Sequence, residues 1–296
     1  MLYRIKHVTH YQYDQPVTLC YNHAHLMPRD TYYQRCLESR ISIKPYPENI
    51  HERIDYFGNK VCYFSLESKH SCLEISVDSK VYLDSERIDP GVDLGMGTTC
   101  RQALENLRTS IDEEVLLARE FILRSPMIKP SDELRAYAAP FFQDNVSLLS
   151  AARKLTHHIY NEFTYDPNST TVATPLKEVL EKRRGVCQDF AHLAIGCLRS
   201  LGFPARYVSG YLETLPPPGT KKLAGSDASH AWFAVYSPGE GWFEFDPTNN
   251  NVPGDQHITT AWGRDYSDVT PVRGVIFEGG DSQVLTVSVD VQRLES

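Results

Sequence analysis

The chain has 296 residues, which allows two domains, and 41% of them are hydrophobic and 23% charged. This composition is that of a globular protein and excludes wholesale disorder. The formal net charge of −8, without a basic stripe to neutralise phosphates, argues against nucleic acid as a partner. No apolar run approaches the roughly 18 residues that a membrane-spanning helix needs, so we expect no membrane partner.

The cysteine pattern bears on the cellular compartment. Seven cysteines occur at irregular spacing, and an odd number favours reduced thiols over a disulfide framework. The opening segment, Met1 to His7, alternates like a strand and lacks the apolar run of a signal peptide. We therefore expect a cytoplasmic protein, and the pattern indicates nothing about its oligomeric state.

Residues 1–90 are predicted to form a β-rich domain. Alternate residues of the first segment share one face and are mostly aromatic or β-branched: Tyr3, Ile5, His7, Thr9, Tyr11 and Tyr13. Residues 40–44, 61–67 and 73–83 also alternate or carry β-branched and aromatic side chains. Short strands separated by turn signals predict an antiparallel, sandwich-like domain.

Residues 91–145 are predicted to be a linker and a helical connection. The linker signal covers 88–99, which holds three glycines and a proline. Helical patterns follow at 112–123 and in a segment that Ser131 can cap.

Residues 146–296 are predicted to form a second domain in which helices precede strands, an α+β order. Its helices are expected at 147–163, at 176–184, where Gly185 ends the helix, and at Cys187 to Leu201. The expected strands are 205–212, 229–236, 242–246, 272–277 and 284–291. The last two strands are counted with this domain, although the pattern leaves open whether they pack on its core or on the first domain.

Cys187 is a candidate nucleophile because it opens a predicted helix. The thiolate is the reactive form of cysteine, and the free N–H groups and partial positive charge of a first helical turn favour it. Gly185 permits a close backbone approach or a special φ just before it, and the Cys187 N–H can donate to an oxyanion. Taken alone, a cysteine is more often a core residue, which is what we expect of Cys197.

His230 and Asp246 add a base and a carboxylate on one predicted hairpin. If Ser237 pairs with Gly241 across the turn, Asp246 lies diagonal to His230, within side-chain reach. That register places four side chains on one face: His230, Trp232, Glu244 and Asp246. A slip of one residue would separate His230 from Asp246, so the catalytic hypothesis depends on this register.

Three spaced motifs now occur in the order Cys, His, Asp: Gly-Val-Cys187-Gln-Asp-Phe-Ala, Ser-His230-Ala-Trp and Glu-Phe-Asp246-Pro-Thr. Together they resemble the core of the bacterial transglutaminase-like superfamily, which includes proteins described as cysteine proteases. The opening Tyr-Arg-Ile-Lys-His-Val-Thr-His-Tyr segment resembles the β-rich N-terminal region that accompanies this core. The resemblance implies a papain-like or transglutaminase-like fold, with helices packed on an antiparallel sheet.

The resemblance also implies a catalytic triad for thiol acyl transfer. Cys187 would be the nucleophile, His230 the base and later the acid, and Asp246 the group that orients the base. An amide of a peptide or protein would form an acyl-enzyme, and no cofactor is implied. Water as the acceptor gives hydrolysis, as in a peptidase or amidohydrolase, whereas an amine gives protein-glutamine transglutaminase-type transfer. A non-catalytic protein-binding module is a further alternative, disfavoured because the triad is complete.

Several neighbouring residues are weaker candidates for a role in the site. Tyr165 could lend its hydroxyl to the oxyanion or be a core aromatic, and Gln188 is a second oxyanion candidate. Three aromatic residues are candidates for lining a substrate cleft: Trp232, Tyr211 and Trp242. The long segment 213–228 is expected to be a surface loop, with a lid as the alternative. No third ligand accompanies His23 and His25, so no metal is predicted.

Overall fold

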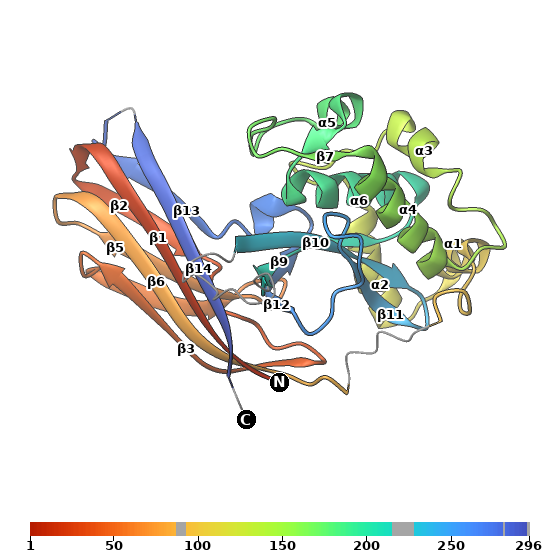
Figure 1. Ribbon diagram of the computed structural model, residues 1–296, viewed down its shortest axis with the longest axis horizontal. Helices are drawn as coiled ribbons and strands as arrows, with labels where there is room; N and C mark the ends of the chain where they lie inside the picture. The colour runs from red at the N-terminus through yellow and green to blue at the C-terminus, as the bar shows by residue number, and fades with distance from the viewer. Residues whose placement is uncertain (87–92, 215–227, 281, 295–296) are drawn as a thin grey trace, which may run out of the picture.

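The computed structural model describes residues 1–86, 93–214, 228–280 and 282–294. They form two units side by side, a β sandwich and an α+β unit in which helices cover one face of a sheet (Figure 1). The predicted α+β class is confirmed, with antiparallel sheets first and a helix-covered antiparallel sheet after them.

Two four-stranded antiparallel sheets make the sandwich. The first runs in the order β14 (Gln283–Leu294), β1 (Leu2–Val17), β6 (His70–Leu83) and β3 (Gln34–Lys44). The second runs in the order β13 (Val272–Phe277), β2 (Leu19–Ala24), β5 (Lys60–Leu66) and β4 (Asn49–Ile54). Buried side chains of both sheets, such as Val77 on β6 and Phe64 on β5, belong to one apolar cluster between them.

The C-terminal strands differ from the predicted domain boundary. The sequence counted them with residues 146–296, but β14 pairs with β1 from Leu2–Leu294 to Tyr13–Gln283, and β13 pairs with β2. The physical reason is the edge of the sheet: without β14, the 16-residue β1 would expose a long row of unpaired backbone groups. The two ends of the described chain therefore lie next to each other (Figure 1).

The second unit is built on the sheet order β11 (Gly241–Phe245), β10 (Ala228–Ser237), β9 (Ala205–Leu212) and β12 (His257–Gly263). Its α-helices are α1 (Cys100–Thr109), α2 (Glu113–Arg119), α3 (Asp132–Ala138), α4 (Leu148–Glu162), α5 (Leu176–Lys182) and α6 (Cys187–Leu201). The predicted bounds of α6 are confirmed. This helix is buried on all sides from Gln188 to Ser200, because α3, α4 and α5 pack on one side and β9 and β10 on the other.

The segment 91–145 was predicted to be a linker and a helical connection, but its helices are part of the second unit. Helix α1 was not predicted, although Thr99 and Gln102 form a capping box that marks its start. Ala103 of α1 and Leu134 of α3 join the same buried cluster as α4 and α6, so these helices are part of the helical layer.

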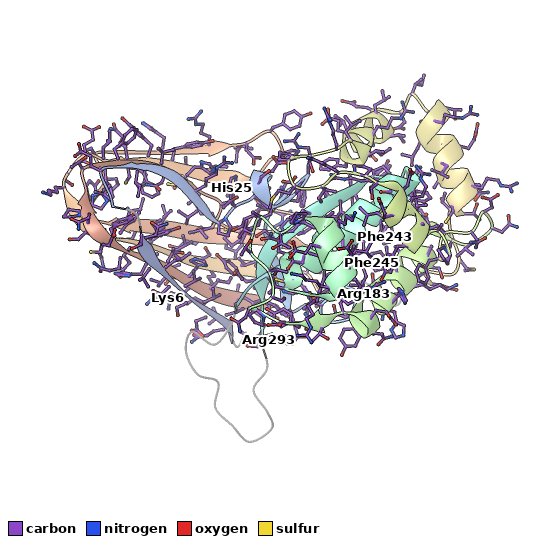
Figure 2. All side chains as sticks on the ribbon, turned by 90° about the horizontal axis from the view of Figure 1, so that it is seen from above. Lys6, His25, Arg183, Phe243, Phe245 and Arg293 are labelled. Carbon is purple, nitrogen blue, oxygen red and sulfur yellow. The ribbon has the colours of Figure 1, made fainter. Side chains whose placement is uncertain are left out.

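The two units share an apolar interface. Tyr3 and Ile5 of β1 form one buried cluster with Tyr211 of β9 and Ile258 of β12. At its border, Arg293 of β14 pairs with Glu213 at 2.9 Å, and Figure 2 labels Arg293 where the sandwich meets the second unit. Among the described residues, no helix is long and apolar enough to cross a membrane.

Candidate active site

The local backbone places Cys187 at the start of α6. Two short parallel strands precede it, β7 (Thr164–Tyr165) and β8 (Arg184–Gly185), and Tyr165 pairs with Gly185. Cys187 is half-buried and is the first residue of the helix. That end of a helix favours an anion such as a thiolate.

Asp189 closes the first turn of α6. Its Oδ2 accepts the backbone N–H of Val186 at 2.8 Å and the hydroxyl of Thr170 at 2.7 Å. Burial raises the pKa of this carboxyl, while the two hydrogen bonds act in the opposite direction. A Cβ at Gly185 would lie 2.6 Å from Oδ2, so the close approach expected at this glycine is confirmed.

The special φ expected at Gly185 is not there. The left-handed residue is Arg183, with φ of 54°, and it caps α5 at its C-terminus. The helix therefore ends at Lys182, three residues before the glycine that was expected to end it.

The hairpin of β10 and β11 has the predicted register. Ser237 pairs with Gly241 and Phe233 with Phe245. The rings of Phe233 and Phe245 stack on the face opposite to His230, at 5.7 Å between centroids. With this face buried, the register cannot slip by one residue without exposing it.

His230 lies between Cys187 and Asp246. Its Nε2 is 2.8 Å from Asp246 Oδ2, and the ring also forms a hydrogen bond with Cys187. Burial opposes a positive charge on this ring, but the hydrogen bonds to Asp246 and Cys187 outweigh it and raise the pKa of His230 to about 10. The arrangement therefore favours an imidazolium beside the sulfur.

Asp246 is wholly buried yet fully supplied with donors. Its Oδ1 accepts the backbone N–H groups of Thr248, at 2.9 Å, and Asn249, at 3.1 Å. Its Oδ2 accepts the Asn249 side chain at 2.7 Å besides the His230 ring. Burial alone would raise its pKa, but hydrogen bonds from His230 and His257 hold the pKa of this carboxyl well below its usual range. Asp246 is therefore a fixed anion at neutral pH.

Sequence reasoning missed His257 and Asn249. His257 begins β12, 11 residues after Asp246, and its Nε2 lies 3.2 Å from Asp246 Oδ2. No motif points to His257, because its position depends on the pairing of β12 with β9. Asn249 follows the Asp-Pro-Thr motif by one residue, so the turn after Asp246 could have suggested it.

One group among the described residues has metal-ligand spacing. His230, Asp246 and His257 each offer an atom, and these atoms lie within 4.8 Å of one another. Hydrogen bonds between the imidazole nitrogens and Oδ2 already account for this closeness. The expectation of a metal-free site remains a prediction.

The two oxyanion candidates differ in their surroundings. Tyr165 is 54% exposed, and burial of its hydroxyl followed by the nearby Cys187 raises its pKa. Gln188 is buried, and its side-chain N–H donates to the carbonyl of Val172 at 3.3 Å. Tyr165 is thus the more exposed of the two candidates, and Gln188 is already bound to the backbone.

The three aromatic cleft candidates are placed elsewhere. Trp232 is wholly buried, and its Nε1–H donates to Glu244 at 2.7 Å. Its ring packs against the His230 ring, at 5.9 Å between centroids. Tyr211 is buried in the interface between the two units, where its hydroxyl donates to the Leu26 carbonyl. Trp242 packs against Phe121 at 5.2 Å between ring centroids. Trp232 and Tyr211 are buried by this packing, so neither lines an open cleft, whereas Trp242 is partly exposed and its role in a cleft stays a prediction.

Two further features concern the surroundings of α6. His192 on this helix is buried and accepts the backbone N–H of Tyr266 at 3.1 Å. Most of the expected loop 213–228 lies outside the described residues.

Comparisons with known proteins agree with this architecture. Residues 3–82 match the bacterial transglutaminase-like N-terminal region, and residues 135–247 match the transglutaminase-like superfamily. The second match contains Cys187, His230 and Asp246. The chain belongs to the transglutaminase-like superfamily, with the bacterial N-terminal region ahead of its core.

Similar proteins support the same assignment. An uncharacterized protein of Mycobacterium tuberculosis is 40% identical over 299 residues, which cover 99% of this chain and 93% of that protein. The protein-glutamine gamma-glutamyltransferase of Pseudomonas aeruginosa is 32% identical over 125 residues, 42% of this chain and 18% of that protein. A crystal structure of a "putative cysteine protease" from Cytophaga hutchinsonii matches with a TM-score of 0.75 at 23% identity and covers 100% of this chain and 91% of that one. At this identity the last likeness shows the fold.

Proposed function

We propose that this protein is a cysteine-dependent hydrolase of amide bonds in peptides or proteins, with Cys187 as the nucleophile. The observation that carries the proposal is the bridge made by His230, which meets Cys187 on one side and the buried Asp246 carboxylate at 2.8 Å on the other. A sulfur, a base and an orienting carboxylate in this order are what thiol acyl transfer requires.

The first half of the reaction forms an acyl-enzyme. The Cys187 thiolate attacks the amide carbonyl carbon, and the negative charge moves to the carbonyl oxygen. The Cys187 N–H at the free helix terminus and the Tyr165 hydroxyl are the donors for this oxyanion. The imidazolium of His230 then gives its proton to the departing amine, and a thioester remains on Cys187.

The second half returns the enzyme to its resting state. Neutral His230 takes a proton from water, the hydroxide attacks the thioester, and the carboxylic acid leaves. The proton stays on His230 and restores the ion pair with the thiolate. Asp246 stabilises the imidazolium in both halves without taking up a proton itself, because its five donors keep it ionised.

Solvent access favours hydrolysis over transfer to an amine. Cys187 is half-buried and Tyr165 is 54% exposed, so water reaches the thioester. Transfer would need an acceptor cleft that keeps water out, and the buried Trp232 and Tyr211 do not line one. Amine transfer is the second candidate, supported by the likeness of part of the chain to a named gamma-glutamyltransferase.

The test uses p-nitrophenyl acetate, a general acylating substrate, on the full chain. We expect a burst of p-nitrophenol and an acetyl group on Cys187, located by peptide mass spectrometry, in the wild type. Cys187→Ala should lose the burst, and His230→Ala should lose most of its rate. A burst that survives in Cys187→Ala, or an acetyl group on other cysteines alone, would overturn the proposal.

A second assay separates the acceptors. Casein is incubated with the enzyme, with and without dansylcadaverine, and the products are mapped by mass spectrometry. New peptide termini or deamidated side chains that require Cys187 indicate hydrolysis. Dansylcadaverine attached to glutamine in place of those products would contradict hydrolysis and select the transferase.

A further inference from the structure

One oxygen of Asp246 lies between two imidazole rings. His230 on β10 approaches Oδ2 at 2.8 Å, and His257 on β12 approaches the same atom at 3.2 Å. His257 is only 1% exposed, and the centroids of the two rings are 6.1 Å apart. The mechanism proposed above uses His257 only as one of the donors that keep Asp246 ionised.

The backbone decides which nitrogen of His257 carries the proton. The N–H of Gly254 donates to Nδ1 at 3.4 Å, so Nδ1 is the acceptor nitrogen. In the neutral ring the proton is therefore on Nε2, which faces Asp246. His257 is thus a donor to the carboxylate, and it meets Oδ2 from a different strand than His230 does.

The packing around His257 fixes the position of this donor. The Trp232 ring meets the His257 ring edge to face, at 5.2 Å between centroids and 82° between planes. Between the two histidine strands runs β9, where Gly210 pairs with His230. A Cβ at Gly210 would lie 2.2 Å from the Ile258 carbonyl oxygen and 2.6 Å from the Trp232 ring. Because Gly210 has no side chain, β12 and Trp232 can pack closely against β9. We call the packed group of Gly210, Trp232 and Ile258 the wall behind Asp246.

We infer that His257 is a positioning residue of the proposed reaction, and that its Nε2–H holds the Asp246 carboxylate in the orientation that meets His230. The inference rests on the proposed function, since it concerns the same triad. It assigns His257 no contact with the substrate or with the reacting sulfur.

Two opposing effects decide whether the loss of His257 raises or lowers the reaction rate. His257 shares Oδ2 with His230, which weakens the attraction of that oxygen for the imidazolium. His257 also removes a freedom of movement from Oδ2, whose other support is Asn249, and a donor lost inside a buried site is costly. A displacement of about 1 Å in a catalytic group can cost on the order of 100-fold in rate, so the positioning effect is the larger.

The experiment compares three substitutions at His257 in the full chain. A glutamine amide nitrogen reaches close to the imidazole Nε2 position, whereas an asparagine amide is too short and leucine has no donor. The readout is the rate of Cys187 alkylation by iodoacetamide at pH 6, together with the thermal unfolding temperature. We expect alkylation to slow by about ten- to 100-fold in His257→Asn and His257→Leu, and His257→Gln to regain most of the rate.

His7→Leu is the matched control. His7 is also a histidine with 1% exposure, on neighbouring β1, and its Nε2 is paired with Thr9 at 2.7 Å instead of the triad. We expect this variant to unfold at a lower temperature without a change in the alkylation rate. If His257→Leu does not fold, the pair of His257→Asn and His257→Gln carries the test.

The outcomes separate the two proposals. Fast labelling of Cys187 in the wild type, with equal rates in His257→Asn and His257→Gln, would overturn the positioning role and leave the proposed function in place. Wild-type labelling of Cys187 that is no faster than that of the exposed Cys72 would overturn the proposed function itself.

Discussion

The residues that the structure describes contain two cysteine–histidine pairs, one in each unit. In the sandwich, the sulfur of Cys20 lies 3.8 Å from Nε2 of His70, and both side chains are buried. In the second unit, Cys187 meets His230 at the start of α6. The residue types are the same, so any difference in chemistry comes from what surrounds each pair.

The partner of the second ring nitrogen separates the two pairs. Nδ1 of His70 donates to the carbonyl of Ser68 at 2.7 Å, a neutral acceptor, so Nε2 is left to accept from the Cys20 thiol. Burial raises the pKa of Cys20, which keeps it a thiol. His230 faces the Asp246 carboxylate instead, and this anion stabilises an imidazolium. A cysteine–histidine pair thus becomes a nucleophile and base when a fixed carboxylate and a helix terminus accompany it.

The largest expected effect comes from removing each sulfur in turn. Cys187→Ala should lower the rate of acylation by p-nitrophenyl acetate by at least about 10³-fold, because no other sulfur has this environment. Cys20→Ala should leave that rate unchanged and lower the free energy of unfolding by about 1 kcal/mol, as a small buried side chain is lost. Stopped-flow kinetics and urea titration measure the two quantities. A similar loss of rate in both variants would remove the distinction between the pairs.

The next effect tests the carboxylate that distinguishes the pairs. Asp246→Asn keeps the shape of the side chain but removes its charge and allows the wrong histidine tautomer, so we expect the acylation rate to fall by about 10³- to 10⁴-fold. Circular dichroism should show a folded protein. A loss of less than about tenfold would mean that His230 works without the anion.

The protonation of His230 as a function of pH tests directly whether the Asp246 carboxylate distinguishes the two cysteine–histidine pairs. Burial opposes its charge, but hydrogen bonds with Asp246 and Cys187 raise its pKa from 6.5 to about 10. The contribution of the imidazolium to stability is therefore fully present below about pH 6.5 and is lost as the pH rises through about 10. In Asp246→Asn the carboxylate no longer offsets the effect of burial, so the titration midpoint of His230 should move to lower pH. NMR titration of labelled histidines, with His230→Ala for assignment, measures both midpoints, and an unchanged midpoint would contradict the account.

The smallest expected effect concerns the wall behind the triad. Gly210→Ala places a Cβ against the Ile258 carbonyl and the Trp232 ring, so we expect a loss of about 2 kcal/mol in the free energy of unfolding. Gly254→Ala is the matched control, because its Cβ would meet no atom within 4 Å, and it should change stability by less than about 0.5 kcal/mol. Equal unfolding temperatures for the two variants would show that Ile258 and Trp232 move to make room for the added methyl group.

Local sequence patterns predicted what short-range physics determines. The helix from Cys187 to Leu201 follows from its apolar spacing and from Gly202 at its end, and the Ser237–Gly241 pair follows from the turn between two alternating segments. These two elements were enough to bring Cys187, His230 and Asp246 into one hypothesis. Family resemblance added the roles of the three residues.

Long-range pairing decided the features that the sequence did not predict. The alternating pattern of 284–291 is the same whether its partner is the second unit or β1, and the choice depends on an edge almost 300 residues away in the chain. The position of His257 depends on how β12 pairs with β9. The pattern makes Tyr211 and Trp232 candidates for a cleft, Trp232 because it shares a face with His230 and Asp246, but buried interfaces use aromatic side chains equally well.

The most direct test of the central claim is a competition between two thiols of the wild-type chain for a limiting amount of iodoacetamide at pH 6. Cys72 is exposed and Cys187 is half-buried, so access alone predicts that Cys72 reacts first. The account predicts the opposite order, with modification found mainly on Cys187 by peptide mass spectrometry and this preference lost in His230→Ala. Equal or slower modification of Cys187 in the wild type would contradict an ionised nucleophile at this site.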